Sequence, residues 1–166
     1  ISTYSYVEST PLAAYDMYGL KAVRLPPLGP RDPIPDGTIH CQGGVVKPFI
    51  NPNAMTSWQR ECIGDCAFVH ESSHVSDAQK TNPGVCKYWG WVPFIYPKGI
   101  VGFSSKSELM RSELRAYAAE LRCLAAKLRT TTCQSDRCKN VIEDRIVDIT
   151  HAILPTVYDQ TYPEGL

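Results

Sequence analysis

Two histidines and a glutamate near the middle of the chain have the spacing that metal chemistry requires. They form the run His70-Glu71-Ser72-Ser73-His74, an H-E-x-x-H motif. On a helix, residues four apart lie on the same face, so the two imidazoles can reach one ion. Glu71 would lie near enough to take a proton from a metal-bound water. Because neutral imidazole and an open fourth position suit zinc, the motif predicts a Zn²⁺ site with Glu71 as its general base.

The third ligand has to come from elsewhere in the chain, because a catalytic zinc usually has three protein ligands. A third histidine in the pattern H-E-x-x-H-x-x-G-x-x-H is excluded, since Asp77 and Lys80 occupy the positions it needs. Glu113 is the predicted ligand, and Glu120 is the alternative. Both are expected to border the apolar stripe of a later helix, where an unpaired carboxylate would be costly to bury.

The motif itself is expected to lie on a long helix. Thr56 and Gln59 form a T-x-x-Q capping box at the start of this helix, and Asn82-Pro83-Gly84 ends it. Gly64 weakens a helix by about 1 kcal/mol relative to alanine, so we expect a bend near the start.

Two further helices are predicted to form an antiparallel hairpin, because the loop between them is short. The first runs from Ser105, which begins a second capping box with Glu108, to about Leu128. The second is capped by Ser135 and ended by Pro155. Their apolar faces consist of Leu109, Met110, Leu114, Tyr117, Leu121, Leu124 and Leu128, and of Val141, Ile142, Ile146, Ile149 and Ile153.

A small β-hairpin is predicted before the motif helix. Residues 38–50 read as two short strands around Gly43-Gly44, and Pro48 confines the second strand to a sheet edge. Such an edge could bind an extended peptide, and an ordinary hairpin is an equal alternative. His40 in this hairpin is interpreted as a surface or capping histidine rather than a ligand.

Long irregular segments complete the chain. Residues 1–36 are rich in proline and predict an extended wrapping segment or linker, with a short helix at 11–18. Residues 81–103 are irregular and aromatic, and either line a substrate groove or pack over the core. The tail from Tyr158 has no clear structure. We therefore expect a mainly α (α+β) fold in which residues 37–166 form a single domain.

Composition excludes several classes of function. The 166 residues carry 17 basic and 17 acidic side chains, so the formal net charge is zero and no basic stripe indicates nucleic acid. No apolar run approaches the length of a membrane span. The chain begins with Ile1, which favours a processed protein or a domain cut from a longer chain.

The motif and its surroundings resemble a known family. H-E-x-x-H followed by Glu113-x2-Ala116-Tyr117 resembles the gluzincin branch of the zincin metallopeptidases. The finer pattern resembles the zincin-like toxin domains at the C-terminal ends of bacterial polymorphic toxins and of VgrG or Rhs proteins delivered by type VI secretion. That pattern, which falls within about residues 58–128, is Cys66-x3-His70-Glu71-x2-His74-x2-Asp77, then Cys86, then Glu113-x2-Ala116-Tyr117-x2-Glu120-x2-Cys123-Leu124.

The resemblance implies a zincin-like fold in which Glu113 is the third ligand and Asp77 orients His74. It also implies a peptide or protein substrate, a cognate immunity protein and an upstream delivery domain as partners. Domains of this kind act against a rival cell, often in its periplasm, so a secreted protein is expected.

Seven cysteines fit such an oxidising compartment and predict disulfides, with at least one thiol left over. A thiolate zinc site is the alternative, although the chain has no C-x-x-C pair. The expected pairings include Cys62 or Cys66 with Cys86 or Cys123, and a Cys133–Cys138 bridge across the loop of the helical hairpin.

Together these residues predict metal-assisted peptide hydrolysis by a secreted zinc metallopeptidase, an antibacterial effector domain. Glu71 would take the proton of the attacking water and pass it to the leaving amine. Either Tyr117 or His151 would donate a hydrogen bond to the oxyanion. Two other functions stay open: a catalytically silent zincin-like binding module, and a disulfide-stapled structural domain in which H-E-x-x-H is accidental.

Overall fold

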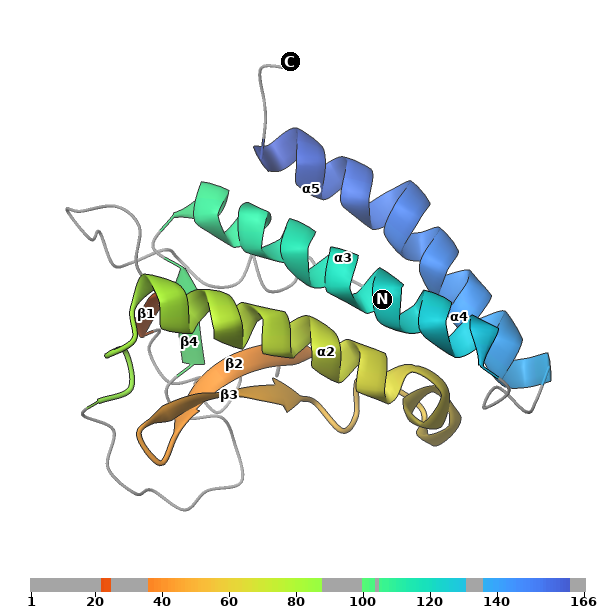
Figure 1. Cartoon of the computed structure of the whole chain (residues 1–166), viewed down its shortest axis with the longest axis horizontal. Coiled ribbons are helices and arrows are strands. Elements are labelled where there is room, and N and C mark those ends of the chain that lie inside the picture. Colours follow the sequence, from red (N-terminus) through yellow and green to blue (C-terminus); the bar gives the residue numbers. More distant parts are fainter. Residues whose placement is uncertain (1–21, 25–35, 88–99, 104, 131–135, 162–166) are drawn as a thin grey trace.

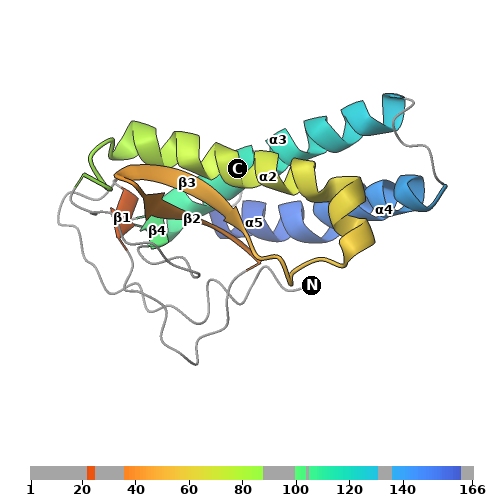
Figure 2. The same cartoon turned by 90° about the horizontal axis from the view of Figure 1, so that it is seen from below.

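The helix that carries H-E-x-x-H, α2 (Ser57–Thr81), is the element against which most of the others pack. In the computed structural model it runs antiparallel to α3 (Lys106–Arg129), with a small antiparallel sheet beside it (Figures 1 and 2). A continuous helical rod packs on α3 and consists of α4 (Asp136–Val147), the π-helical turn η1 (Asp148–Ile153) and α5 (Leu154–Thr161). The fold is therefore α+β.

The structure describes residues 22–24, 36–87, 100–103, 105–130 and 136–161, and for 22–24 and 159–161 it describes the backbone alone. Several sequence predictions lie outside these residues. They concern the short helix at 11–18, the Ser135 cap, Cys133, and the aromatic residues Tyr88, Trp89, Trp91, Phe94 and Tyr96.

The predicted ends of α2 are confirmed. Gln59 N donates to Thr56 Oγ1 at 3.3 Å and Thr56 N donates to Gln59 Oε1 at 3.0 Å, which is the reciprocal capping box. The helix ends at Thr81, and Asn82 is its C-cap, directly before Pro83. Its first turns run at an angle to the rest (Figures 1 and 2), as expected from Gly64.

The α3 helix also forms as predicted. Glu108 N donates to Ser105 Oγ at 3.2 Å, so Ser105 is the N-cap, and the helix continues to Arg129. Met110, Tyr117 and Leu124 of its apolar face are buried, which fixes the side of α3 that faces the interior.

The prediction that Pro155 ends the last helix is wrong. The prediction that the tail from Tyr158 lacks structure is wrong as far as Thr161, and residues 162–166 lie outside the described residues. The chain passes from α4 through η1 into α5, which contains Pro155 and continues to Thr161. Proline inside an α-helix loses one hydrogen bond and clashes with the carbonyl four residues earlier. The wider π-helical turn directly before Pro155 relieves that clash, and burial of Ile149 and Val157 holds the rod against α3.

The predicted hairpin is confirmed as β2 (Gly37–Gln42) and β3 (Val45–Ile50). Gly43 and Gly44 connect the strands with φ values of 60° and 81°, the left-handed region that a tight hairpin turn requires. Pro48 lies on β3, which is an edge strand, as expected.

Two strands were not predicted. β4 (Ile100–Phe103) pairs with β2, and β1 (Ala22–Arg24) pairs with β4, so the sheet has the order β1-β4-β2-β3. The expectation that residues 81–103 are irregular throughout is therefore wrong at its end. β4 is buried along its whole length, and burial of this short apolar run against α2 and α3 explains why it forms.

Three disulfides hold the elements together, with Cα–Cα distances between 5.2 and 5.4 Å. Cys66–Cys123 is among the predicted pairings. Cys86 pairs with Cys41 on β2, and Cys62 pairs with Cys138 on α4, so the predicted Cys133–Cys138 bridge is wrong. The reason is tertiary: α4 packs against the start of α2, which brings Cys138 beside Cys62.

The disulfides indicate an oxidising compartment. Among the described helices, none is long and apolar enough to cross a membrane.

Candidate metal centre

Two histidine rings on α2 and one carboxylate on α3 meet between these helices. His70 Nε2 lies 3.2 Å from His74 Nε2. Glu113 reaches both rings, with Oε2 3.5 Å from His70 Nε2 and Oε1 3.5 Å from His74 Nε2. Both histidines are buried, and the three side chains form a group that could hold a metal ion.

Antiparallel packing of α2 and α3 explains this arrangement. His70 and His74 lie one turn apart on one face of α2, and Glu113 and Glu120 lie two turns apart on one face of α3. Because the helices run in opposite directions, the earlier carboxylate meets both rings and the later one meets only His70. Cys66–Cys123 fastens the same two helices one turn beyond His70.

The spacing of the three groups fits a metal ion. Ligands of a tetrahedral zinc at about 2.0–2.1 Å are separated from one another by roughly 3.3–3.4 Å. The three observed separations are 3.2, 3.5 and 3.5 Å. Glu113 Oε2 is buried, and no described residue gives it a hydrogen bond. A cation between the three groups would satisfy this oxygen, which is costly to leave unpaired.

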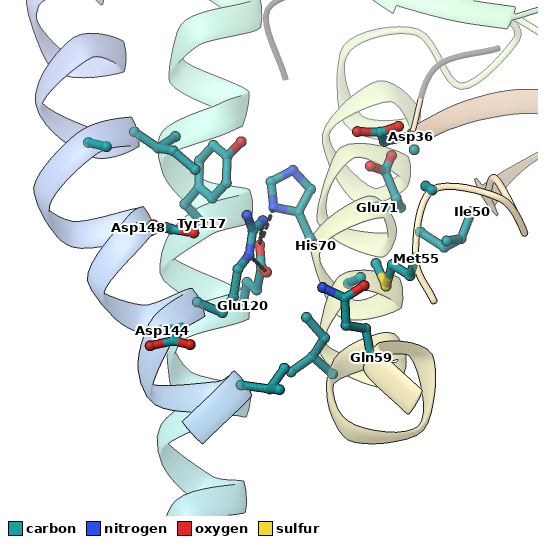
Figure 3. Close-up of a pocket in the computed structure, with 18 of the residues that line it drawn as sticks. Asp36, Ile50, Met55, Gln59, His70, Glu71, Tyr117, Glu120, Asp144 and Asp148 are labelled. Carbon is teal, nitrogen blue, oxygen red and sulfur yellow. Dashed lines mark hydrogen bonds and ion pairs between the residues drawn. The ribbon is translucent and has the colours of Figure 1, made fainter. Parts of the chain in front are cut away.

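The far side of the His70 ring is held by an ion pair. His70 Nδ1 lies 3.0 Å from Glu120 Oε2 (Figure 3). Arg145 on α4 holds both oxygens of Glu120, with Nε 2.8 Å from Oε1 and Nη2 3.2 Å from Oε2. Burial would raise the pKa of Glu120, but His70 and Arg145 outweigh it and lower that pKa. Glu120, the alternative ligand, thus lies on the side of the ring opposite Glu113.

The far side of the His74 ring is held by a hydroxyl. His74 Nδ1 lies 2.8 Å from Ser112 Oγ, and Ser112 Oγ donates to Asp77 Oδ2 at 2.8 Å. Arg115 Nε donates to the same Asp77 oxygen at 2.9 Å. Asp77, expected to orient His74, is therefore connected to it through Ser112.

These contacts favour the tautomer of each ring that leaves Nε2 free to accept a proton or a metal ion. The Glu120 carboxylate can only accept, and Ser112 uses its proton on Asp77, so both Nδ1 atoms carry the hydrogen. Both Nε2 atoms then direct lone pairs to the same point, an arrangement that either a shared proton or a bound cation would stabilise.

A proton can take the place of that cation. Burial alone would lower the pKa of His70, but Glu113 and Glu120 outweigh burial and raise the pKa to about 10. Burial would likewise raise the pKa of Glu113, but His74 and His70 outweigh it and hold that pKa well below its usual value. The centre is therefore built to stabilise one positive charge.

Glu71 lies beside this group, and the backbone of β2 approaches it closely. The residue is 8% exposed, and burial is the main cause of its raised pKa. A Cβ atom at Gly37 would overlap the Glu71 carboxylate, so a side chain at that position would displace it. The absence of a side chain at Gly37 gives the carboxylate its space.

Of the two candidate oxyanion donors, Tyr117 is the one beside the group. Its ring is buried and lies 4.5 Å from the His70 ring, measured between centroids. His151 is exposed on η1. Tyr117 lines the cavity next to His70, and His151 does not.

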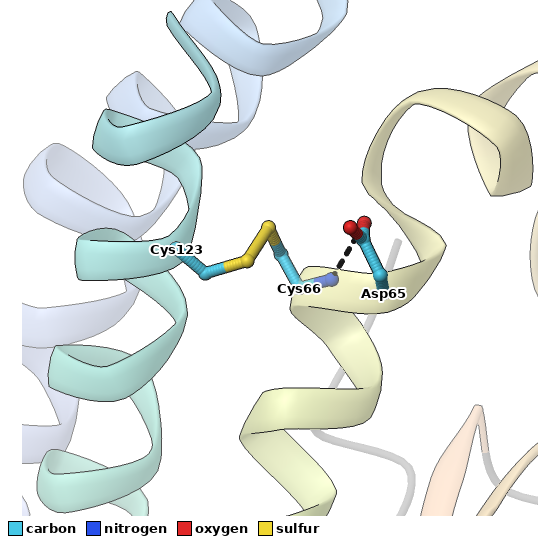
Figure 4. A group of neighbouring side chains, drawn as sticks. All are labelled: Asp65, Cys66 and Cys123. Atoms are coloured by element: carbon cyan, nitrogen blue, oxygen red, sulfur yellow. Dashed lines mark hydrogen bonds between the residues drawn. A yellow bond between two sulfur atoms is a disulfide. The ribbon is translucent and has the colours of Figure 1, made fainter. Parts of the chain in front are cut away.

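A second cluster of ligand-type residues does not offer thiolates. Asp65, Cys66 and Cys123 lie close together, but the two sulfur atoms are bonded to each other (Figure 4). Six of the seven cysteines are in disulfides, so these six cannot form the alternative thiolate zinc site.

Comparisons with protein-family models, curated proteins and solved structures found no match.

Sequence reasoning missed three residues of the site: Ser112, Arg115 and Arg145. Each contacts either a histidine ligand or the carboxylate that supports one, and the contacting residues are 25 to 38 positions apart in the sequence. Only Ser112 could have been inferred from the sequence. It directly precedes Glu113, the predicted third ligand, and so had to lie near His74 as well.

Proposed function

We propose that the protein is a zinc-dependent metallopeptidase. The observation that carries the proposal is the convergence of two lone-pair nitrogens and one orphaned carboxylate at ligand spacing, next to a buried glutamate. His70, His74 and Glu113 would hold the ion. When bound, zinc supplies a Lewis acid and a water of lowered pKa.

The chain's own residues would perform the other steps. Glu71 would accept a proton from the attacking water and deliver it to the leaving amine, and burial, which raises its pKa, favours the uptake of that proton. Tyr117 would donate a hydrogen bond to the oxyanion, and its packing on His70 fixes its position. The edge strand β3 would bind the substrate backbone in extended form.

The resemblance and the disulfides together support a wider proposal. Two antiparallel helices carrying H-E-x-x-H and a later glutamate, beside an edge strand, are what a zincin-like fold requires. The protein would be a secreted antibacterial effector domain that acts in the periplasm of a target cell. Its partners would be a cognate immunity protein and an upstream delivery domain.

Two other functions are less well supported. An accidental H-E-x-x-H in a stapled structural domain would not account for two separate supports that hold both Nδ1 atoms. A catalytically silent binding module would have no need for a buried carboxylate at Glu71.

The test separates metal binding from turnover. Protein purified without added zinc is expected to contain about one equivalent of metal and to cleave members of a peptide library. Glu71→Gln should keep the metal and lose hydrolysis, whereas His74→Ala should lose both. Glu143→Gln, an exposed change on α4, is the matched control.

Two results would contradict the proposal. One is hydrolysis by Glu71→Gln at the wild-type rate. The other is wild-type protein that binds no zinc when titrated in chelator-buffered solution.

A further inference from the structure

A cavity of about 380 Å³ opens beside His70 and Tyr117 (Figure 3). It lies between the start of α2, the α4–η1 rod and the segments on either side of the hairpin. Its volume is within the range of small-ligand sites and is large enough for one long side chain. Because it adjoins the proposed catalytic residues, a substrate side chain next to the cleaved bond would enter it.

The walls of the cavity combine apolar surface with carboxylates. Met55, Trp58, Ile63 and Ile153 are among the apolar residues that line it. The acidic residues of the lining are Asp36, Glu71, Glu120, Asp144 and Asp148. Arg145 is the one lysine or arginine among the described lining residues, and Glu120 already binds it through both oxygens.

Four of these carboxylates lack a salt bridge to a described residue, although Asp148 interacts electrostatically with Arg145. Asp36, Asp144 and Asp148 make no salt bridge with any described residue. Glu71 is the most buried of the four at 8% exposed, and the charges of the nearby His74 and His70 rings partly offset the effect of burial on its pKa, whereas Asp36 is half-buried and Asp144 and Asp148 are exposed. The carboxylates of Glu71 and Asp36 lie on one side of the cavity, and those of Asp144 and Asp148 lie on the opposite side (Figure 3).

We propose that this cavity binds a lysine or arginine side chain of the substrate. The inference rests on the proposed peptidase function and names its substrate class. The aliphatic stem of lysine or arginine would pack on the apolar wall, and its charged end would lie between the carboxylates. An acidic side chain would meet like charges, and an apolar one would gain no electrostatic attraction from them. The net charge of the whole chain is zero, so this concentration of negative charge is local.

The first experiment measures kcat/KM for peptides that differ at one residue on either side of the cleaved bond: arginine, lysine, norleucine or glutamate. Arginine and lysine peptides should be preferred. Asp144→Asn/Asp148→Asn should lower kcat/KM for them by about three- to tenfold, through KM, and leave norleucine peptides unchanged. Glu143→Gln is the control, because Glu143 is exposed on α4, lies near Lys139 and does not line the cavity.

The second experiment does not depend on turnover. Amide chemical shifts of the His74→Ala variant are followed by NMR during titration with acetylated, amidated arginine and with its norleucine counterpart. Arginine should shift resonances around residues 144–148, and norleucine should not. A free amino-terminal ammonium is the other source of such a cation, and it would appear as a preference for unacetylated norleucine amide.

The outcomes separate the two proposals. Hydrolysis without a preference for basic residues, or equal losses for all peptides in Asp144→Asn/Asp148→Asn, would overturn the inference while the peptidase proposal stands. Aspartate-dependent binding of capped arginine to a protein that hydrolyses nothing would support the cavity and contradict the peptidase. Preference for the free amine would also overturn the assignment to a side chain.

Discussion

The two histidines of the centre are supported in different ways. On the side toward α4, His70 contacts a buried carboxylate, Glu120, which Arg145 holds in place. On the other side, His74 contacts the hydroxyl of Ser112, and the charges of Asp77 and Arg115 lie one residue further away.

This difference separates charge from orientation. A carboxylate at Nδ1 both orients an imidazole and makes its other nitrogen more basic, whereas a hydroxyl mainly orients it. His70 should therefore contribute more to metal affinity through charge, and His74 should contribute through position. Changes in metal affinity offer a common scale on which the two sides can be compared.

The largest effect is expected from pH and concerns the His70 side. Metal binding needs a neutral imidazole, and in the metal-free protein the pKa of His70 is raised to about 10. Binding should therefore release a proton, and zinc affinity should rise about tenfold per pH unit, or about 100-fold between pH 7 and pH 9. Titrations in chelator-buffered zinc would measure this slope, and an affinity independent of pH would contradict it.

The same pKa fixes the sign of a stability effect. A pKa raised from 6.5 to about 10 on folding contributes stability that is complete below pH 6.5 and is lost as the pH rises toward 10. The metal-free protein should therefore become less stable over this range, and the zinc-loaded protein should change less. Thermal unfolding of both forms at pH 6.5, 8 and 9.5 would show the difference.

Removal of the charge on the His70 side should have the next largest effect. Glu120→Gln keeps the shape of the side chain and should weaken zinc binding by about 10- to 100-fold. It should also flatten the pH dependence, because the pKa of His70 would fall. Glu61→Gln, an exposed change on α2, is the control. An unchanged pH slope in Glu120→Gln would mean that Glu113 alone sets the pKa of His70.

Removal of the hydroxyl on the His74 side should cost less. Ser112→Ala leaves the His74 Nδ1 hydrogen without an acceptor, whereas Asp77 keeps its ion pair with Arg115. We expect zinc affinity to fall by about tenfold, the lower end of the usual range, with the pH slope retained. Ser107→Ala, exposed on the same helix, is the control. A loss equal to that of Glu120→Gln would remove the distinction between the two sides.

The smallest effect on zinc affinity is expected from removal of the Cys66–Cys123 disulfide, which lies next to His70. Cys66→Ala/Cys123→Ala should lower the free energy of unfolding by about 2–4 kcal/mol and weaken zinc binding only a few fold, since the packing of α2 on α3 remains. Cys41→Ala/Cys86→Ala, at the sheet end, should cost similar stability and leave zinc affinity unchanged. Denaturant unfolding and zinc titration of both variants would test this.

Features set by local chemistry could be predicted from the sequence. The capping boxes at Thr56 and Ser105 and the Gly43-Gly44 turn depend on neighbours within a few residues. Features set by distant contacts could not. β4 is held by strand pairing across the sheet and burial under helices, and α5 continues past Pro155 because a π-helical turn precedes it.

The candidate site likewise has features that local sequence predicts and features that depend on distant contacts. The spacing within H-E-x-x-H pointed to His70 and His74, and the cost of a buried carboxylate pointed to Glu113 and Glu120 without deciding between them. Which of the two faces the Nε2 atoms depends on the direction of α3 relative to α2, a tertiary property. The roles of Ser112 and Arg145 depend on it as well.

The bare backbone at Gly37 offers a way to silence the protein without touching its charges. One methyl group there would push the Glu71 carboxylate aside, while the ion-binding side chains and the sulfur bridges would be left as they are. Gly37→Ala should therefore yield a folded, metal-loaded and inert form, provided the displaced carboxylate finds room in the neighbouring cavity. Such a form would serve as an inactive reference that keeps the zinc-binding side chains of the wild-type protein.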